Sequence, residues 1–164
     1  VPRADPNNPN LVANIKPGAA ASRALEATGD VKRGEALFKL QTCATCHTTA
    51  NGQPPKGPHL VDIGKRYKKA ELIESILKPS AKIAQGFDTY VFVLKNGKAM
   101  TGFVTSESAG EVELRQTNGI SSTIRKSEVG VRRKSPGSVM PVGLVNSLTP
   151  EQLADLVAYL QSLR

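Results

Sequence analysis

Apolar residues recur at helical spacing in three separate stretches of the chain. In the first, apolar and small residues share one face and Asp30 precedes them as a capping residue. In the second, four aliphatic residues form a stripe that Pro79 ends, since proline disfavours helical backbone before it. In the third, Thr149 and Gln152 can form a capping box. Helices are therefore predicted over about residues 31–41, 69–77 and 150–163.

Between the second and third helices the pattern changes to an alternation with a period of two residues. In its first run, Tyr90, Phe92 and Leu94 fall on one face, as expected for a half-buried strand. Two Asn-Gly pairs, at Asn96 and Asn118, separate alternating runs, and Asn-Gly is typical of tight hairpins. The pattern predicts a meander of about four antiparallel strands over residues 87–131.

The first 28 residues differ from the rest because they are rich in proline, asparagine and alanine. Such a segment buries little apolar surface, so we expect residues 1–28 to be a linker or a loosely ordered arm. Residues 29–164 would then form one domain. The predicted fold class is mainly α, with the β insert between the second helix and the loop that precedes the last helix.

The chain has 164 residues and a formal net charge of +8. No apolar run approaches the roughly 20 residues that a membrane helix needs, so no transmembrane segment is expected. The sequence opens at Val1 without a leader, which indicates either a removed signal peptide or an excerpt of a longer protein. The basic charge raises the question of nucleic acid, but no aromatic platform interleaves the basic residues, so we expect no nucleic-acid partner.

Cys43, Cys46 and His47 form the sequence Cys-x-x-Cys-His, the attachment signal for c-type haem. In a helical turn, residues three and four apart share a face. Both thiols can then reach the haem vinyl groups while the imidazole points toward the iron. The spacing favours one covalently attached haem c.

Three other readings of these residues are a zinc knuckle, a thioredoxin-like redox dithiol and a chance occurrence of the motif. Zinc needs four ligands, and His59 is the remaining histidine, while His47 is poorly placed to join its neighbour Cys46 on one tetrahedral ion. A dithiol motif normally follows a strand in a βαβ unit, whereas a predicted helix precedes Cys43. All three readings are less favoured than haem.

Further motifs on both sides of Cys43 carry a resemblance to a known family. The chain resembles class I cytochromes c, and more narrowly the haem-binding domain of planctomycete and verrucomicrobial proteins, over about residues 29–164. The segments that carry the resemblance are Gly34-Glu35-Ala36-Leu37-Phe38, Gly57-Pro58-His59-Leu60, Gly64-Lys65-Arg66-Tyr67, Ile76-Leu77-Lys78-Pro79-Ser80, the strand region, Ser135 to Met140-Pro141, and Leu148 to Leu153 with Ala158-Tyr159-Leu160.

The resemblance implies a cytochrome c-like helical fold around one haem, with His47 as the proximal iron ligand. It implies that the carbonyl of Pro58 accepts a hydrogen bond from the His47 ring, which fixes the tautomer. It also implies that the first and last helices cross closely, with Gly34 admitting the partner backbone and Phe38 packing on Tyr159.

Three side chains compete for the distal position on the iron. Met140 matches the Met-Pro motif of the family and sits in a loop rich in proline and glycine. Met100 falls in a predicted strand, where a packed methionine is the simpler reading. His59 adjoins Pro58 and so belongs on the His47 side. The resemblance therefore favours Met140.

Haem propionates need donors, and Arg66 and Tyr67 are the candidates because they follow the proximal loop. Lys65 and Lys82 are weaker candidates. The alternative reading is that Arg66 and Tyr67 are surface residues at a helix start.

Histidine and methionine ligands fill both axial positions and favour electron transfer over oxygen chemistry. We therefore expect a non-enzymatic, single-electron carrier, free or as the electron-accepting domain of a larger periplasmic redox enzyme. Its partners would be redox proteins, including a fused or docking dehydrogenase. The alternative is a peroxidase-like haem enzyme or a redox or gas sensor with a labile or absent methionine ligand. Haem c maturation implies a periplasmic or otherwise exported protein.

The strand region has a simple structural reading, and the basic run at its end has two readings. The insert can simply cover one haem edge. The basic run is more simply a solvated surface, although it could dock an acidic redox partner. The run comprises Arg125, Lys126, Arg132, Arg133 and Lys134.

Overall fold

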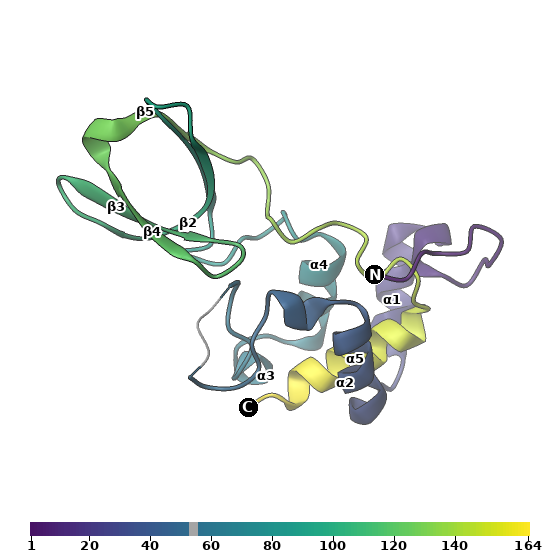
Figure 1. Ribbon diagram of the computed structural model, residues 1–164. Coiled ribbons are helices and arrows are strands. Elements are labelled where there is room, and N and C mark those ends of the chain that lie inside the picture. Colours follow the sequence, from purple (N-terminus) through teal and green to yellow (C-terminus); the bar gives the residue numbers. More distant parts are fainter. Residues whose placement is uncertain (53–55) are drawn as a thin grey trace.

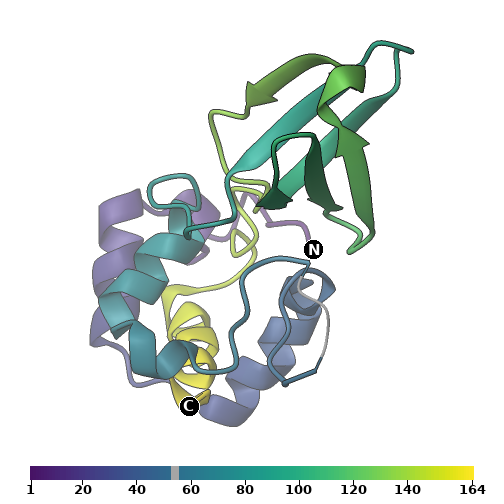
Figure 2. The same ribbon diagram turned by 90° about the vertical axis from the view of Figure 1, so that its left-hand side faces the viewer.

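The computed structural model describes residues 1–52 and 56–164 and consists of a helical half and a β-sheet half. Both views place the sheet at one end of the helical half (Figures 1 and 2). The helices are α1 (Pro17–Glu26), α2 (Val31–Leu40), α3 (Ile63–Arg66), α4 (Lys69–Leu77) and α5 (Pro150–Ser162), with short 3-10 turns at Val12–Asn14, Cys43–Thr45 and Lys126–Glu128. The strands are β1 (Thr89–Leu94), β2 (Ala99–Glu107), β3 (Glu111–Gln116), β4 (Ser121–Arg125) and β5 (Val129–Lys134).

The prediction of a mainly α fold is wrong. The chain is 34% helical and 20% strand, and its strands form one five-stranded antiparallel sheet. Amphipathic helices dominate the pattern of the sequence, so its strands resemble a minor insert. The sheet instead has a hydrophobic core of its own, built on Phe92, Met100, Val112, Leu114 and Ile124.

The fifth strand was not predicted because its apolar alternation is limited to Val129 and Val131, and basic residues follow. Its last three residues are Arg132, Arg133 and Lys134, and every residue after Val129 is exposed. β5 is an edge strand that pairs with β1, and its register is set by backbone hydrogen bonds and by Arg132. The Arg132 guanidinium lies 4.9 Å from the Tyr90 ring centroid, a cation–π contact that a search for apolar periodicity does not detect.

The two faces of the sheet have different roles. Strand order is β4-β3-β2-β1-β5, and both Asn-Gly pairs form the predicted hairpin turns, with Gly97 and Gly119 at positive φ. Tyr90, Phe92 and Leu94 share the face that packs into the sheet core, as their alternation predicted. The opposite face carries Phe103, which is buried but lies outside that core.

The three predicted helices are confirmed, each with its end signals. The Asp30 side chain accepts a hydrogen bond from the Arg33 backbone N–H at 2.8 Å and caps α2. Thr149 and Gln152 form the capping box of α5, with Pro150 in the first turn. Such caps contribute about 1 kcal/mol each, because they satisfy amide groups that the helix cannot.

Helix α5 is the centre of the helical half and crosses α2 closely. A Cβ atom on Gly34 would overlap the backbone carbonyl of Asp155, so only glycine allows this approach. One turn further along α2, the Phe38 and Tyr159 rings pack with centroids 5.5 Å apart. Both contacts are those that the resemblance implied.

The N-terminal segment is more structured than its composition suggested. Residues 17–26 form α1, and Ala20 and Ala24 are fully buried in the core of the helical half. Lys69 of α4 donates hydrogen bonds to the carbonyls of Leu25 and Ala27 and so completes the end of α1. Small alanines allow close helix packing, which a search for large apolar residues overlooks.

The two segments that join the helical half to the sheet run next to each other. The backbone N–H of Ser138 donates to the Ser80 hydroxyl at 3.0 Å. The N–H of Ser135 donates to the carbonyl of Thr89 at 2.7 Å. The chain therefore leaves the helical half and returns to it through two adjacent segments.

Candidate functional site

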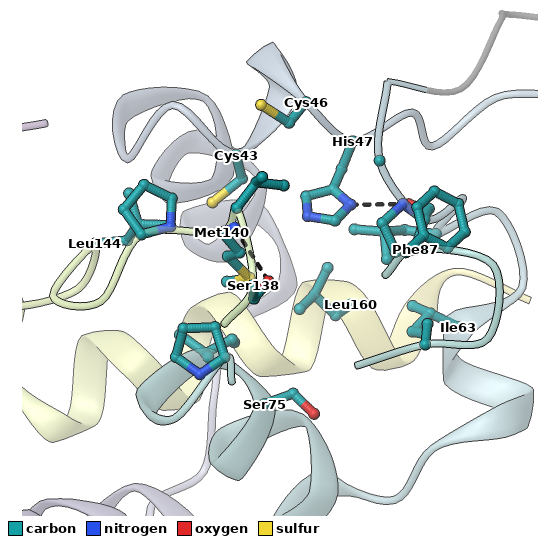
Figure 3. Close-up of a pocket in the computed structure, with 18 of the residues that line it drawn as sticks. Cys43, Cys46, His47, Ile63, Ser75, Phe87, Ser138, Met140, Leu144 and Leu160 are labelled. Carbon is teal, nitrogen blue, oxygen red and sulfur yellow. Dashed lines mark hydrogen bonds between the residues drawn. The ribbon is translucent and has the colours of Figure 1, made fainter. Parts of the chain in front are cut away.

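A cavity of about 480 Å³ lies between α5, α4, the Cys43 turn, the Met140 loop and the face of the sheet that carries Phe103. Figure 3 shows Cys43, His47 and Met140 along one part of it, with Ile63 and Leu160 opposite. Most of the wall is aliphatic or aromatic. The size and the apolar lining are those of a site for a small organic ligand or cofactor.

The Cys43 turn is positioned by the way α2 ends. Thr42 has φ 61°, a left-handed conformation that stops the helix and reverses the chain. The next residues form a tight turn in which the His47 backbone N–H donates to the Cys43 carbonyl at 2.9 Å. Cys43, Cys46 and His47 thus lie on one turn against the cavity, as their spacing predicted.

The His47 ring is fixed by a hydrogen bond to the Pro58 carbonyl at 2.8 Å. A carbonyl oxygen only accepts, so Nδ1 carries the proton and Nε2 keeps a free lone pair. Burial lowers the pKa of His47, and the bond to Pro58 only partly opposes this. The imidazole is therefore neutral at neutral pH, the form in which it can bind a metal.

The two thiols differ in exposure. Burial raises the pKa of Cys43 to about 11, whereas Cys46 is exposed at the rim of the cavity. One sulfur therefore lies within the wall and the other lies where the cavity meets solvent.

Met140 lines the cavity from the loop that precedes α5. Its backbone N–H donates to the Ser138 hydroxyl at 3.1 Å, a bond drawn in Figure 3. The other two candidates lie elsewhere. Met100 is buried in the sheet core, and His59, outside the cavity wall, bonds through Nδ1 to the Thr48 hydroxyl at 2.6 Å.

Arg66 and Tyr67 both line the cavity, and so does Lys82, whereas Lys65 does not. The Arg66 guanidinium bonds to Asp62 at 2.9 Å and to the His59 carbonyl at 2.8 Å. The guanidinium carbon of Arg66 lies 6.0 Å from the centroid of the Tyr67 ring, and Nζ of Lys82 lies 5.9 Å from it. Polar donors are thus gathered along one part of an otherwise apolar wall.

The donor set fits a covalently attached haem. It combines an apolar slot, two thiols and an imidazole on one turn, a thioether on a separate loop, and cationic side chains at the rim. In residues 1–52 and 56–164, no three His, Cys, Asp or Glu side chains are grouped as a metal ion would need. Within the same residues, no helix combines the length and the apolarity required to cross a bilayer.

Some residues of the cavity wall were not found from the sequence. Phe87, Phe103 and Thr117 come from the sheet half and its entry segment. The available signal was that Phe103 is apolar on the face of β2 opposite Met100, which is unexpected for a sheet with one solvent-facing side. Alternation shows that such a residue faces away from the sheet core, but not what it faces.

The basic run after β4 is largely paired within the sheet. Glu107 binds Lys126 and Arg132, each at 2.9 Å, and Asp88 binds Lys134 at 2.9 Å. Hydrogen bonds from Arg132 and Lys126 lower the pKa of Glu107 to about 2. This supports the reading of the run as a structural surface rather than a free cationic docking face.

The model of the cytochrome c family matches residues 31–112, which is half of the chain and includes the Cys43 turn. A 35-residue segment is 60% identical to a cytochrome c from Dictyostelium discoideum. That segment spans 21% of this chain and 30% of the relative.

The chain belongs to the cytochrome c family. It accordingly binds haem c covalently, as the domains of this family do. The family match ends before the Met140 loop and α5, so the distal side of the cavity rests on the geometry above.

Proposed function

We propose that the protein is a monohaem, single-electron carrier in which Cys43 and Cys46 form the thioether bonds and His47 and Met140 bind the iron. The observation that carries this proposal is the convergence of His47 and Met140 on one cavity although they are 93 positions apart. A haem with both axial positions filled exchanges one electron without binding a substrate.

Each residue has a defined task in this proposal. The Pro58 carbonyl keeps the proton on Nδ1 of His47, so that Nε2 remains available to the iron. Arg66 and Tyr67 neutralise and bond the propionates. Electrons pass through the exposed rim near Cys46, where the attachment turn meets solvent.

The rim also suggests the kind of partner. Arg66 is paired with Asp62 and is assigned to the propionates, which leaves Lys56 and Lys82 as the other charged residues that line the cavity, and both are basic. A donor or acceptor with an acidic face would be steered to this edge, and the encounter rate would fall with added salt.

The experiment is optical and electrochemical. We expect the haem-loaded protein to be low-spin, to titrate with a one-electron Nernst slope, and to show the weak long-wavelength band of methionine sulfur on ferric haem. Met140→Ala should abolish the band. Met100→Ala, which truncates the methionine in the sheet core, should retain it. A high-spin native haem that binds CO directly would contradict the proposal and favour a haem enzyme or a gas sensor.

We further propose that the chain works in the periplasm or an equivalent compartment, free or as the electron-accepting domain of a larger redox enzyme such as a dehydrogenase. The β insert supports the narrower planctomycete and verrucomicrobial subtype. Haem staining of a denaturing gel of native extract tests whether the carrier is free or fused to a larger enzyme, because thioether-bound haem stays with its polypeptide. A stained band near 17.4 kDa indicates a free carrier, and a larger band indicates a fusion.

A further inference from the structure

The sheet contributes an aromatic wall to the haem cavity. Phe103 is only 2% exposed, yet it belongs neither to the core of the sheet nor to that of the helical half. Protein atoms, among them the Phe87 ring, already cover most of this side chain. Phe103 also lines the cavity, so a cofactor held there would lie against it.

Strand alternation explains why Phe103 points away from the sheet core. On β2, Met100 and Val104 pack into that core, and Phe103 has the opposite parity. The register agrees, because Phe92 pairs with Met100 on the core face, whereas Thr89 pairs with Phe103 on the other face.

A second aromatic residue holds Phe103 in place. The Phe87 ring, in the segment just before β1, lies edge-on to the Phe103 ring with centroids 5.2 Å apart. Both rings line the cavity. Edge-to-face pairs are favourable by about 0.5–1.5 kcal/mol beyond the area they bury, so the two side chains form a fixed surface.

The sheet also reaches the other side of the attachment turn. Thr117, at the start of the β3–β4 turn, lines the cavity. A Cβ atom on Gly119, in the same turn, would lie 3.3 Å from Cγ of Lys56, which follows the attachment turn in sequence. The sheet therefore bounds the cavity at two separated places.

We propose that Phe103, supported by Phe87, contacts the haem and keeps water from it, and that the sheet thereby raises the reduction potential. This inference rests on the proposed attachment at Cys43, Cys46 and His47. Ferric haem carries one more positive charge than ferrous haem, so a drier wall disfavours the ferric form. Phe103 is a positioning and packing residue, since it exchanges no electron itself.

The test compares Phe103→Leu with Phe92→Leu. Both variants shorten a buried phenylalanine of the sheet half, but Phe92 lies in the sheet core and not in the cavity wall. We expect Phe103→Leu to lower the reduction potential and to speed the binding of added imidazole to ferric haem several-fold. We expect Phe92→Leu to change neither. Equal effects of the two variants on both quantities would overturn the proposal.

A second measurement uses the wild-type protein and so does not depend on whether a variant folds. In the reduced wild-type protein with labelled phenylalanine, the haem ring current should displace the Phe103 ring proton signals well outside the normal aromatic range. Unshifted Phe103 signals would overturn the proposal. A pyridine haemochrome spectrum of the same sample reports thioether attachment, so failure of this inference is distinguishable from failure of the proposed function.

Discussion

Gly34 of α2 lies directly against the backbone carbonyl of Asp155 on α5. Two other glycines, Gly29 and Gly64, approach carbonyls of the same helix in the same way. Since α5 forms part of the cavity wall and α2 ends at the attachment turn, this contact sets the distance between the haem attachment site and that wall.

Gly34→Ala should therefore lower the free energy of unfolding by at least about 1–3 kcal/mol, because an overpacked contact forces the backbones apart. Urea unfolding followed by far-UV circular dichroism measures the change. Gly18→Ala is the matched control, since a Cβ there meets nothing within 4 Å. An equal loss in both variants would show that the close approach is not what Gly34 provides.

The next prediction concerns pH. Burial acts to raise the pKa of Asp155, but hydrogen bonds from the Arg33 guanidinium and the Asp30 backbone N–H outweigh it, so the pKa is lowered. A lowered pKa in the folded state means that this stability is present above the unfolded pKa of about 3.9 and is lost as pH falls through the folded value. We expect Arg33→Gln to move acid unfolding to higher pH and to lower the stability at pH 7, because the buried Asp155 carboxylate would lose its charged partner.

The control for Arg33 is Lys39→Gln, which removes an exposed ion pair with Glu35 on the same helix. Exposed pairs of this kind add little to stability, because water screens them. If both variants unfold in acid at the same pH, the buried carboxylate of Asp155 does not depend on Arg33.

A separate acid transition is predicted in the sheet. The pKa of Glu107 is lowered to about 2 by hydrogen bonds from Arg132 and Lys126. Its contribution is complete above about pH 4.5. The stabilisation by Glu107 declines as the pH falls from 4.5 to 2. In the wild-type protein, amide exchange of β5, measured by NMR relative to the intrinsic rate at each pH, should accelerate as the pH falls through this range. Glu107→Gln should show fast exchange already at pH 6, and slow exchange there would refute the role of the carboxylate.

The loop that carries Met140 is predicted to depend on Ser80. The Ser80 hydroxyl accepts from the Ser138 N–H, and the Ser138 hydroxyl accepts from the Met140 N–H. Ser80→Ala should lower the temperature at which the long-wavelength band of the methionine-bound haem disappears. Ser80→Thr keeps the hydroxyl, so in this variant the band should disappear at the wild-type temperature. Unchanged band loss in Ser80→Ala would mean that the loop is held by other contacts.

Helices α2, α4 and α5 and the attachment turn could be predicted because their signals are local. Asp30, Thr149 and Pro79 mark helix ends, and Cys43 to His47 is a contiguous motif. The Pro58 bond and the crossing at Gly34 needed the family resemblance, because each joins residues that are distant in sequence or carry no distinctive pattern.

What the sequence did not reveal depends on contacts between residues that are far apart in the sequence. β5 is held by pairing with β1 and by ion pairs, and its basic residues look like a solvated run. Phe103 reads as an ordinary strand residue until its neighbours in space are known. The size of the sheet, and hence the fold class, was underestimated for the same reason.

The contact between Ser80 and Ser138 joins positions 58 residues apart in the sequence. Residues 81–137 therefore form one long loop on the helical half, and the two ends of this loop are already in contact. Exchanging that loop for a short turn would add little closure entropy, because the entropic cost grows only slowly with loop length. The sheet is thus a replaceable module: a shortened chain should keep its helices, lose the Phe103 wall and expose the haem, so the part that tunes the cofactor is separable from the part that attaches it.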